Sequence, residues 1–438
     1  MRGGGDERKS VSQGGGGAAR ERLARRDMFP IGATVTMRDL GGELHPLLRR
    51  LRASEPVSWL PVLGGWLVTR RDLALRVLRD ARTFTVDDPR FSTARVIGPS
   101  MLSLDGGDHA RHRDPFAEAF RHDGAVAGLE QFAQAEADRL VCGFAPAGRA
   151  ELRRDLAGPL AVAVVAEVLG LAETEPRVML SWYDEIVGAV SALAGASGQD
   201  GGQGEPTGGP RSGPPGGAAA GAGAAEAFEK LGASLQDVIA ARREGSLLAA
   251  AAGAGGLRGD EVVSNAAVLM FGGIETTEGM ICNAVLHLLG RPGQLRQVAA
   301  DPGLIGNAVE ESLRLEPAAA VVDRYATADV QLGGALVRCG ELVSVSLAGA
   351  GRDPASFPDP DRFDVRRANA RQNLAFAHGP HYCIGAHLAR IEARAAVAAL
   401  LRLLPGLRLD PAQPAAPCGV VFRKPPALHV RWKAGAAR

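Results

Sequence analysis

Four side chains near the C-terminal end of the chain could bind a metal ion: His378, His381, Cys383 and His387. The first three lie in the stretch FAHGPHYCIG, residues 376–385, and His387 follows in a helix-like pattern. Two kinds of centre are compatible with them, a zinc site or a single thiolate ligand set among glycines. The alternative without a metal is a buried, inert cysteine, which is common for a lone Cys.

The spacing of these ligands argues against zinc. His381 and Cys383 are separated by one residue on a glycine-interrupted loop, and His387 lies a full turn into the helix. Structural zinc sites prefer paired ligands such as C-x2-C, usually with two or more Cys. A helix that begins after Cys383 instead points its free N–H groups and positive dipole end at the sulfur. We therefore expect the pKa of this thiol to be lowered, which favours a metal-binding thiolate.

A second chemical group is GGIETT, residues 272–277, within a long helical stretch that starts near Asp260. Its two glycines weaken the helix, and Thr276 can donate a hydrogen bond to the carbonyl of Gly272. An acid, Glu275, beside this hydroxyl is what proton delivery to a bound oxygen requires. Read alone, the pair is also compatible with an N-cap or with the surface of an ordinary helix.

The stretch at 376–385 resembles, position for position, the haem-binding loop F-x-x-G-x-x-x-C-x-G of the cytochrome P-450 family. Phe376, Gly379, Cys383 and Gly385 fill the four fixed places, while Ala377 replaces a usual Gly. GGIETT is similar to the family signature A/G-G-x-D/E-T-T. The resemblance covers about residues 40–432 and implies a soluble bacterial type. Its fold would be mainly α with a small β region, in a single triangular haem domain.

The resemblance implies one haem b as cofactor, with Cys383 as its axial iron ligand and Phe376 and Gly379 in the loop around it. It also implies contacts to the haem propionates, and the matching residues are His109, Arg113, Arg324 and His381. Without the resemblance, His109 and Arg113 are compatible with a solvated basic helix face. His378 and His387 are then expected to be ordinary side chains.

The sequence EESLR places Glu311 and Arg314 three residues apart, on one helical face. Most such pairs are solvated salt bridges. The resemblance implies a buried structural trio, in which Arg362 of PDRF is the third member.

The implied reaction is insertion of one oxygen atom from O2 into a small, mostly apolar organic substrate, by hydroxylation or epoxidation, in bacterial secondary metabolism. Glu275 and Thr276 would be the catalytic, proton-guiding pair. The implied substrate pocket includes Val268, Phe271, Gly272, Ala319, Val321, Val421 and Phe422. The alternatives are a peroxide-using haem-thiolate enzyme, a coupling or cyclisation catalyst, and a non-catalytic haem binder or sensor.

Electrons would come from outside, because 438 residues occupied by one haem domain leave no room for a flavin or iron–sulfur domain. The resemblance implies a ferredoxin with its NAD(P)H-dependent reductase. The basic residues Arg366, Arg367 and Arg371 form either part of a docking face or a solvated loop. We expect a monomer.

The composition is that of a globular protein with a substantial core, at 46% hydrophobic and 23% charged residues. A net charge of +1 predicts neither nucleic-acid nor membrane binding, and no run of 18 uncharged apolar residues occurs. Five scattered cysteines without a CxxC pair disfavour a disulfide framework and favour a reducing cytoplasm.

The pattern predicts a disordered arm at 1–27 and one domain at 28–438, with a flexible Gly- and Pro-rich insertion at 195–223. The resemblance implies that this insertion lies near the substrate entrance. Residues 84–104 are expected to be irregular, and a meander is expected at 353–367. Strands are expected at 57–60, 65–70, 330–332 and 342–347. Helices are expected at 44–54, 71–81, 108–121, 125–143, 159–171, 178–193, 225–244, 260–289, 304–315 and from 386 onward.

Overall fold

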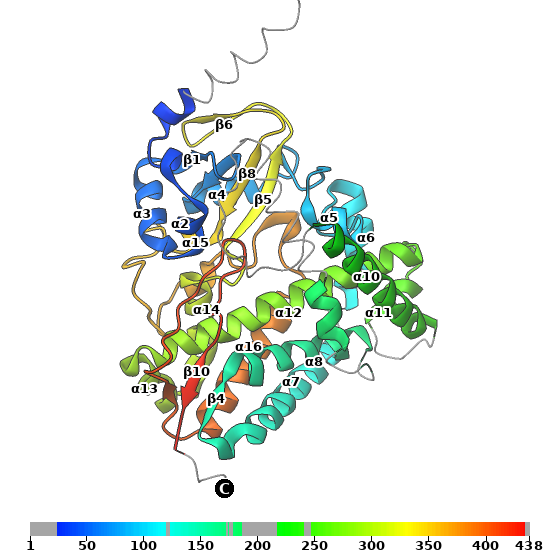
Figure 1. Cartoon of the computed structure of the whole chain (residues 1–438), viewed down its shortest axis with the longest axis vertical. Coiled ribbons are helices and arrows are strands. Elements are labelled where there is room, and N and C mark those ends of the chain that lie inside the picture. Colours follow the sequence, from blue (N-terminus) through cyan, green and yellow to red (C-terminus); the bar gives the residue numbers. More distant parts are fainter. Residues whose placement is uncertain are drawn as a thin grey trace, which may run out of the picture.

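The computed structural model describes residues 24–119, 123–171, 174, 178–185, 217–240 and 247–433. The fold is mainly α with a small β region, as the sequence predicts, and its outline is roughly triangular (Figure 1). The helices are α2 (Met37–Gly41), α3 (Leu44–Ser54), α4 (Arg71–Arg79), α5 (Ser92–Ile97), α6 (Gly106–Ala119), α7 (Asp123–Phe144), α8 (Gly158–Leu169), α10 (Gly217–Ala240), α11 (Leu247–Gly253), α12 (Gly259–Leu289), α13 (Pro292–Ala300), α14 (Ile305–Leu315), α15 (Leu347–Ala350) and α16 (Ala386–Leu403).

The strands form three small sheets. The largest has the order β1-β2-β8-β5-β3, in which only β2 and β8 pair in parallel. A second sheet has the order β4-β10-β9, and β6 pairs with β7. The strands are β1 (Val57–Leu60), β2 (Gly65–Val68), β3 (Phe84–Thr85), β4 (Arg149–Glu151), β5 (Val321–Ala326), β6 (Val330–Leu332), β7 (Ala335–Val337), β8 (Leu342–Ser346), β9 (Arg408–Leu409) and β10 (His429–Arg431).

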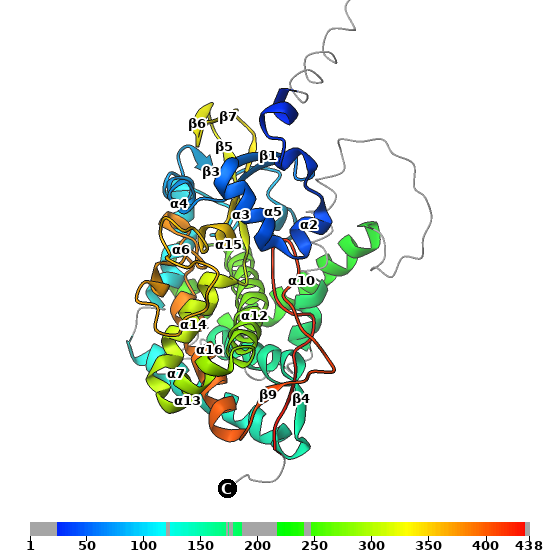
Figure 2. The ribbon, with the colours of Figure 1, turned by 90° about the vertical axis from the view of Figure 1, so that its left-hand side faces the viewer.

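Helix α12 is the central element of the molecule. Figures 1 and 2 show it running between the β-rich part and the helices α7, α8 and α16. It is 31 residues long and apolar on nearly all sides, the pattern of a helix enclosed by other elements. The core around α7, α12, α14 and α16 lies on one side of it, and the core of α8, α10 and α11 on another.

The C-terminal segment is the second long-range connector. It leaves β9, passes beside α2, and returns to β10 (Figure 2). The amide of Gly419 donates to the carbonyl of Gly41, at 2.9 Å, and Cys418 and Lys424 exchange backbone hydrogen bonds across the turn between them. This segment therefore brings residues 418–424 against elements that lie far away in the sequence.

Most expected elements are present, and four differences are informative. Residues 84–104 contain β3 and α5, and β5 and β7 were not predicted. Helix α10 begins at Gly217, inside the segment expected to be flexible, while 195–216 lies outside the described residues. Residues 24–27 belong to a helical turn, although the arm 1–27 was expected to be disordered. Arg25 explains this turn, since it pairs with Glu341 at 2.5 Å and covers the ring of Trp59.

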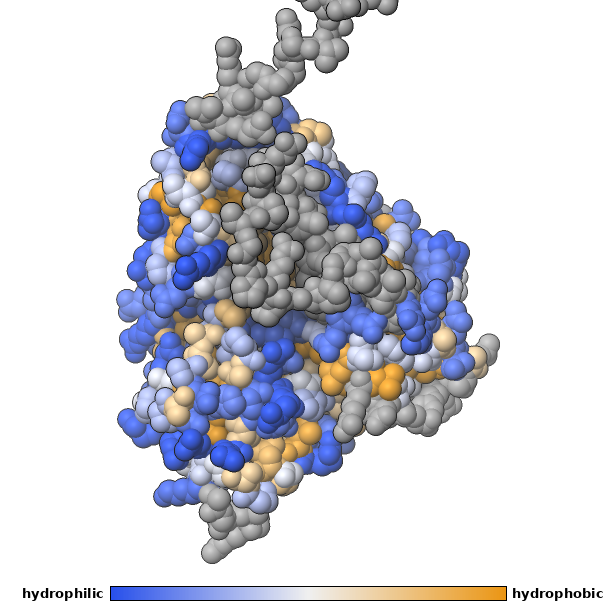
Figure 3. Space-filling view, viewed as in Figure 1, coloured by the Kyte–Doolittle hydropathy of each residue, from blue (hydrophilic) through white to orange (hydrophobic). Residues whose placement is uncertain are grey.

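The molecular surface seen in Figure 3 carries its apolar side chains in separate patches among hydrophilic ones. Within the described part of the chain, no helix is both long enough and apolar enough to cross a membrane.

Candidate functional site

The loop before α16 holds Cys383 in a defined position. The amide of Cys383 donates to the carbonyl of Phe376, at 3.0 Å, which closes the loop. Gly379 has a φ of +75°, and a Cβ there would lie 2.4 Å from the carbonyl oxygen of Leu78. Only glycine fits this position, because it combines a left-handed backbone with close contact to another chain segment. Ala377 also has a positive φ, of 57°. This backbone conformation is strained for alanine, and a glycine at this position would relieve the strain.

Cys383 has exposed surface, yet enough protein surrounds its thiol for burial to affect the pKa of that thiol. It therefore faces a recess in the protein. Burial raises the pKa of this thiol, while the amide of Gly385 and the cations Arg113 and Arg390 act in the lowering direction. The expectation of a lowered pKa was thus wrong, because the helix N-terminus does not outweigh burial. A bound metal ion would deprotonate a coordinating thiol regardless.

Helix α12 presents one accessible face. Between residues 261 and 285 every side chain is buried except Leu269, Gly272, Gly273 and Thr276, which share one face at helical spacing. A Cβ on Gly272 would meet nothing within 4 Å. Ile384, next to Cys383, packs against the same apolar cluster as this part of α12. The Cys383 loop and the accessible face of α12 therefore border one region.

The hydroxyl of Thr276 donates to the carbonyl of Gly272 at 2.6 Å, as the sequence predicts. Glu275 does not lie beside that hydroxyl on the accessible face. It is 8% exposed, its Oε1 lies 2.8 Å from Nζ of Lys424, and its Oε2 accepts a hydrogen bond from Tyr183. The structure therefore turns the acid and the hydroxyl toward different sides of the helix.

Basic residues gather beside the Cys383 loop. His109 and His381 stack with ring centroids 4.4 Å apart, and Arg113 donates to the carbonyl of Tyr382 at 2.6 Å. Arg324 is buried and donates to the carbonyl of Asp323. The structure thus brings His109, Arg113 and His381 together. Asp105 pairs with His381, and its charge also acts on the pKa of Arg324, so Arg324 lies near the same group.

Asp105 is a site residue that the sequence reasoning missed. Its Oδ1 lies 2.8 Å from Nε2 of His381, and its Oδ2 accepts from Thr85 and from the amide of Val86. Burial acts to raise the pKa of Asp105, but these hydrogen bonds lower it to about 2. Asp105 directly precedes the helix that carries His109, which was the one local signal available.

These residues fit the haem that the sequence implies. Nε2 of His109 is buried without a hydrogen-bond partner, and burial lowers the pKa of His109 to about 4. Within the described residues, no carboxylate lies within ion-pair distance of the buried Arg324. Burial lowers the pKa of Arg324 despite the charges of Asp105 and Asp323, so a further anion beside this guanidinium would stabilise it. An anionic group on a flat cofactor that lies between these side chains and the Cys383 thiol would provide a partner for His109 and for Arg324.

The zinc alternative finds no support in the geometry. No three His, Cys, Asp or Glu side chains within the described ranges are arranged to hold a metal ion. His381 is engaged by Asp105, and His387 lies exposed on α16.

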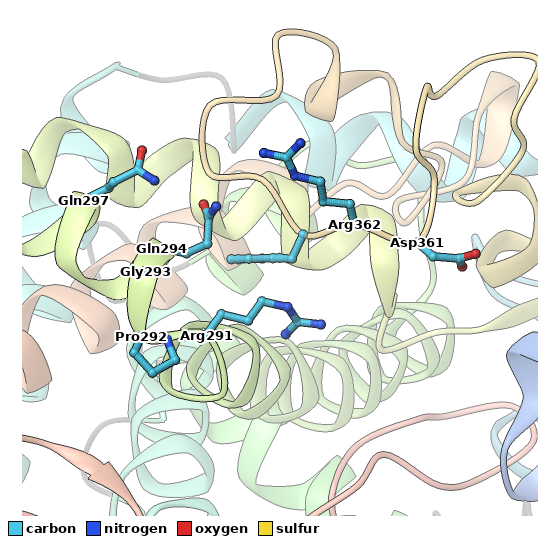
Figure 4. Close-up of a pocket in the computed structure, with 8 residues that line it drawn as sticks. Arg291, Pro292, Gly293, Gln294, Gln297, Asp361 and Arg362 are labelled. Carbon is cyan, nitrogen blue, oxygen red and sulfur yellow. The ribbon is translucent and has the colours of Figure 1, made fainter.

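Glu311 and Arg314 form the predicted buried pair, with two hydrogen bonds of 2.7 and 2.8 Å. The third member is Arg367, whose Nε lies 2.9 Å from Oε1 of Glu311, and the prediction of Arg362 was wrong. The side chain of Arg362 is 65% exposed and lines a surface pocket of about 400 Å³ beside α13 (Figure 4). Only its backbone carbonyl reaches Arg314. At position 362 the meander therefore directs its backbone carbonyl toward the Glu311–Arg314 pair, and at position 367 it directs its side chain there.

The predicted substrate positions come from three segments that meet. Ala319 and Phe422 form a bridge, and the amide of Ala320 donates to the carbonyl of Val421. The rings of Phe271 and Phe422 lie 5.5 Å apart, edge to face, which joins this pair to α12. Val268 and Phe271 are buried in the same cluster, Val321 packs toward α3, and Val421 is exposed. Leu269, Val96, Leu102 and Ile384 are further half-buried apolar residues around this cluster.

Comparisons with known proteins identify the family that this chain resembles. The family profile Cytochrome P-450 matches residues 304–413, which contain the Glu311–Arg314 pair and Cys383. Cytochrome P-450 monooxygenase PikC of Streptomyces venezuelae is 34% identical over 425 residues, covering 91% of this chain and 93% of PikC. Mycinamicin IV hydroxylase/epoxidase of Micromonospora griseorubida is 34% identical, covering 87% of this chain and 94% of that protein. The crystal structure of CalO2 superposes with a TM-score of 0.79 at 29% identity, covering 92% of this chain and 100% of CalO2.

Proposed function

From the premise that this chain belongs to the cytochrome P450 family and is a monooxygenase of that class, we propose that it hydroxylates or epoxidises a mostly apolar compound of bacterial secondary metabolism. The observation that supports this best is the Cys383 thiol, which lies in a recess bordered by basic side chains and by the accessible face of α12.

The cofactor is haem, and we propose that its form is haem b. Cys383 would bind the haem iron through its thiolate, and His109, Arg113, Arg324 and His381 would hold the two propionates. Phe376 and Gly379 shape the loop, and Arg390 of α16 lies 4.3 Å from the centre of the Phe376 ring. Haem with a thiolate ligand supplies the activation of O2, which no side chain can perform.

The protein's own part in the reaction is to position the substrate, exclude water and deliver protons. Apolar side chains from α12, from 318–322 and from 420–422 would hold a substrate by burial and orient it. Thr276 offers its oxygen on the accessible face, since its proton is directed to Gly272. Glu275 would supply protons from the buried side of the same turn.

The substrate class is supported by the relatives and by the lining. Mycinamicin IV hydroxylase/epoxidase is named for both of the reactions proposed here. The two phenylalanines and the small residues Gly272 and Ala319 leave few polar groups to bind a hydrophilic compound. A mostly apolar natural product matches this lining.

The electron donors would be a ferredoxin and its NAD(P)H-dependent reductase. Arg366 and Arg371 have side chains that are 58% and 79% exposed, so they are available to an acidic partner. Arg367, which the sequence grouped with them, is 8% exposed and bound to Glu311, and it is not available.

Absorbance of the reduced protein with carbon monoxide tests the ligand. The wild type should give the long-wavelength band of thiolate-ligated haem, and Cys383→Ala should lose it. His387→Ala is a matched control, because His387 is exposed on the adjoining helix and should leave the band unchanged. A band that survives Cys383→Ala would contradict the assignment.

Turnover tests the class of reaction. Dodecanoic acid, a steroid and a macrocyclic lactone form an apolar probe panel, and binding is read as a shift in the spin state of the ferric haem. We expect NADPH-dependent oxygenation of the best-bound probe with a ferredoxin and its reductase. Product formation with hydrogen peroxide alone would favour the peroxide-using alternative, and spectral binding without any turnover would favour a sensor.

A further inference from the structure

We propose that Lys424 is a positioning residue for the oxygenation reaction, which holds the Glu275 carboxylate on the far side of α12 from Thr276 and controls its access to protons. This inference rests on the proposed function, because it concerns the acid of the proposed proton-guiding pair. It adds a residue that lies outside both recognised motifs, 149 positions after Glu275 in the chain.

Lys424 lies between two buried carboxylates. Its Nζ is 2.8 Å from Oε1 of Glu275 and 2.8 Å from Oε1 of Glu278, and its side chain is 12% exposed. Neither contact has the angle of a hydrogen bond. The ammonium is therefore shared between the two carboxylates and is not locked onto either one. A shared cation of this kind can follow one carboxylate when the other changes its charge or rotates.

The backbone around Lys424 is fixed, so that only its side chain can move. Asn283 of α12 donates to the carbonyl of Arg423, at 2.9 Å, and Lys424 exchanges backbone hydrogen bonds with Cys418. Gly279 permits the close approach, since a Cβ there would lie 3.4 Å from Cβ of Lys424 and 3.0 Å from that of Ala318. The fold thus delivers this ammonium to α12 with precision.

The cluster reaches from the middle of α12 toward the surface. Arg153 pairs with Glu278, has a side chain that is 39% exposed, and also donates to the carbonyl of Pro426 at 3.0 Å. Two carboxylates and two cations make the cluster neutral. The other titratable groups that face it are Tyr183 and Asp184 from 178–185, Cys282 from α12, and Glu151 from β4.

The position of Glu275 requires such control. Successive residues of a helix point about 100° apart, so Glu275 cannot face the region bordered by Thr276 while it contacts Lys424 and Tyr183. To serve the accessible face, its carboxylate must exchange these contacts for others. With Lys424 present, the ion pair holds the Glu275 carboxylate away from that face. With the charge of Lys424 removed, the ion pair is lost and the Glu275 side chain is no longer held in this position.

Lys424→Met removes the charge and keeps much of the side-chain volume. In the haem-loaded enzyme, with the probe that gives the largest spin-state shift, we expect at least a ~10-fold fall in product per NADPH consumed. The midpoint of the pH dependence of this yield should move upward in the variant, because loss of a neighbouring positive charge disfavours an ionised carboxyl. Lys424→Arg should restore most of both values. Lys433→Met, at an exposed lysine of the same segment, is the matched control and should change neither.

Two outcomes would overturn the proposal. One is a Lys424→Met enzyme with wild-type product yield and pH midpoint. The other is a loss of yield that Lys424→Arg does not restore and that parallels a fall in melting temperature and in the thiolate band, because that pattern indicates a purely structural role.

A measurement without turnover separates this proposal from the proposed function. The chain has four lysines, at 9, 230, 424 and 433, so ¹³Cε-lysine labelling gives few NMR signals, and Lys424→Met identifies the relevant one. Glu275→Gln should move the Lys424 signal and leave those of Lys230 and Lys433 in place. An unmoved Lys424 signal contradicts the pairing even in an active enzyme. A wild type without the thiolate band contradicts the proposed function, and the lysine spectra then still decide the pairing.

Discussion

Arg423 and Lys424 are consecutive cations in one turn, yet they lie in two very different clusters. Arg423 is 2% exposed, pairs with Glu316 at 2.7 Å, and donates to the carbonyls of Leu40, Gly42, Pro417 and Gly419. Lys424 contacts two carboxylates without hydrogen-bond angles. A guanidinium with every acceptor in place fixes the fold, whereas an ammonium shared between two acids is free to respond to them.

Arg423→Met should produce the largest loss of stability. It removes one of the partners of the buried Glu316 and the donor to several buried carbonyls, and removing one member of a buried pair costs about 3–5 kcal/mol. Urea denaturation followed by circular dichroism measures this change. Arg431→Met is the control, because Arg431 is 47% exposed in its pair with Asp410 and should cost at most about 1 kcal/mol. Equal losses for the two variants would remove the distinction between saturated and exposed cations.

The second prediction distinguishes Arg367, which pairs with Glu311, from Arg362, to which the sequence analysis had assigned that role. Arg367→Ala removes a charged hydrogen-bond partner of the buried Glu311 and should cost about 2–3 kcal/mol of unfolding free energy. Arg362→Ala removes an exposed side chain and should stay within about 0.5 kcal/mol of wild type. Urea denaturation of both variants decides, and the reverse order would restore the sequence-based assignment.

The third prediction concerns the pH dependence of the Arg423 cluster. Burial acts to raise the pKa of Glu316, but His45 and Arg423 lower it to about 2. A lowered folded-state pKa adds stability that is present above the unfolded pKa near 4.5 and is lost as the pH falls toward 2. Between pH 6 and pH 3 this loss is about 2 kcal/mol. The advantage of the wild type over Glu316→Gln in urea denaturation should shrink by that amount, and a constant difference would contradict the lowered pKa.

The smallest effect is expected at Ala377. Its φ of 57° costs an L-residue about 1–2 kcal/mol, which glycine avoids at the expense of backbone entropy. Ala377→Gly should therefore raise the unfolding free energy by up to about 1 kcal/mol. Thermal unfolding monitored with the haem absorbance would show a higher midpoint, and a lower midpoint would mean that the loop does not retain this conformation in solution. Unlike Lys424, this loop should respond in stability alone.

Features that depend on neighbouring residues were predictable. The hydrogen bond from Thr276 to Gly272 and the pair of Glu311 with Arg314 follow from helical spacing, and both are present. Helices α3 and α4 were placed within two residues, because their buried leucines and valines recur at the helical period. Strand β5 was missed, since it is only partly buried and carries Asp323 and Arg324 in its middle.

Features that depend on packing were not predictable. Whether Arg362 or Arg367 reaches Glu311 depends on the path of the meander over α14, and residue spacing alone does not predict that path. Asp105 lay unnoticed because its partner His381 is 276 positions away. The pKa of Cys383 was predicted in the wrong direction, because burial is a property of the whole fold and the helix N-terminus is a local one.

By itself, the sequence determined the cysteine loop, the weakened turn of α12 and the mainly helical architecture, because these arise from bonds and periodicities that span a few residues. Tertiary structure alone decided which cation meets which acid. It placed Arg423 among saturated acceptors and Lys424 between Glu275 and Glu278, although the two residues are adjacent in the chain. The reason is physical: adjacent side chains on an extended backbone point to opposite sides, and the fold determines which groups lie on each side.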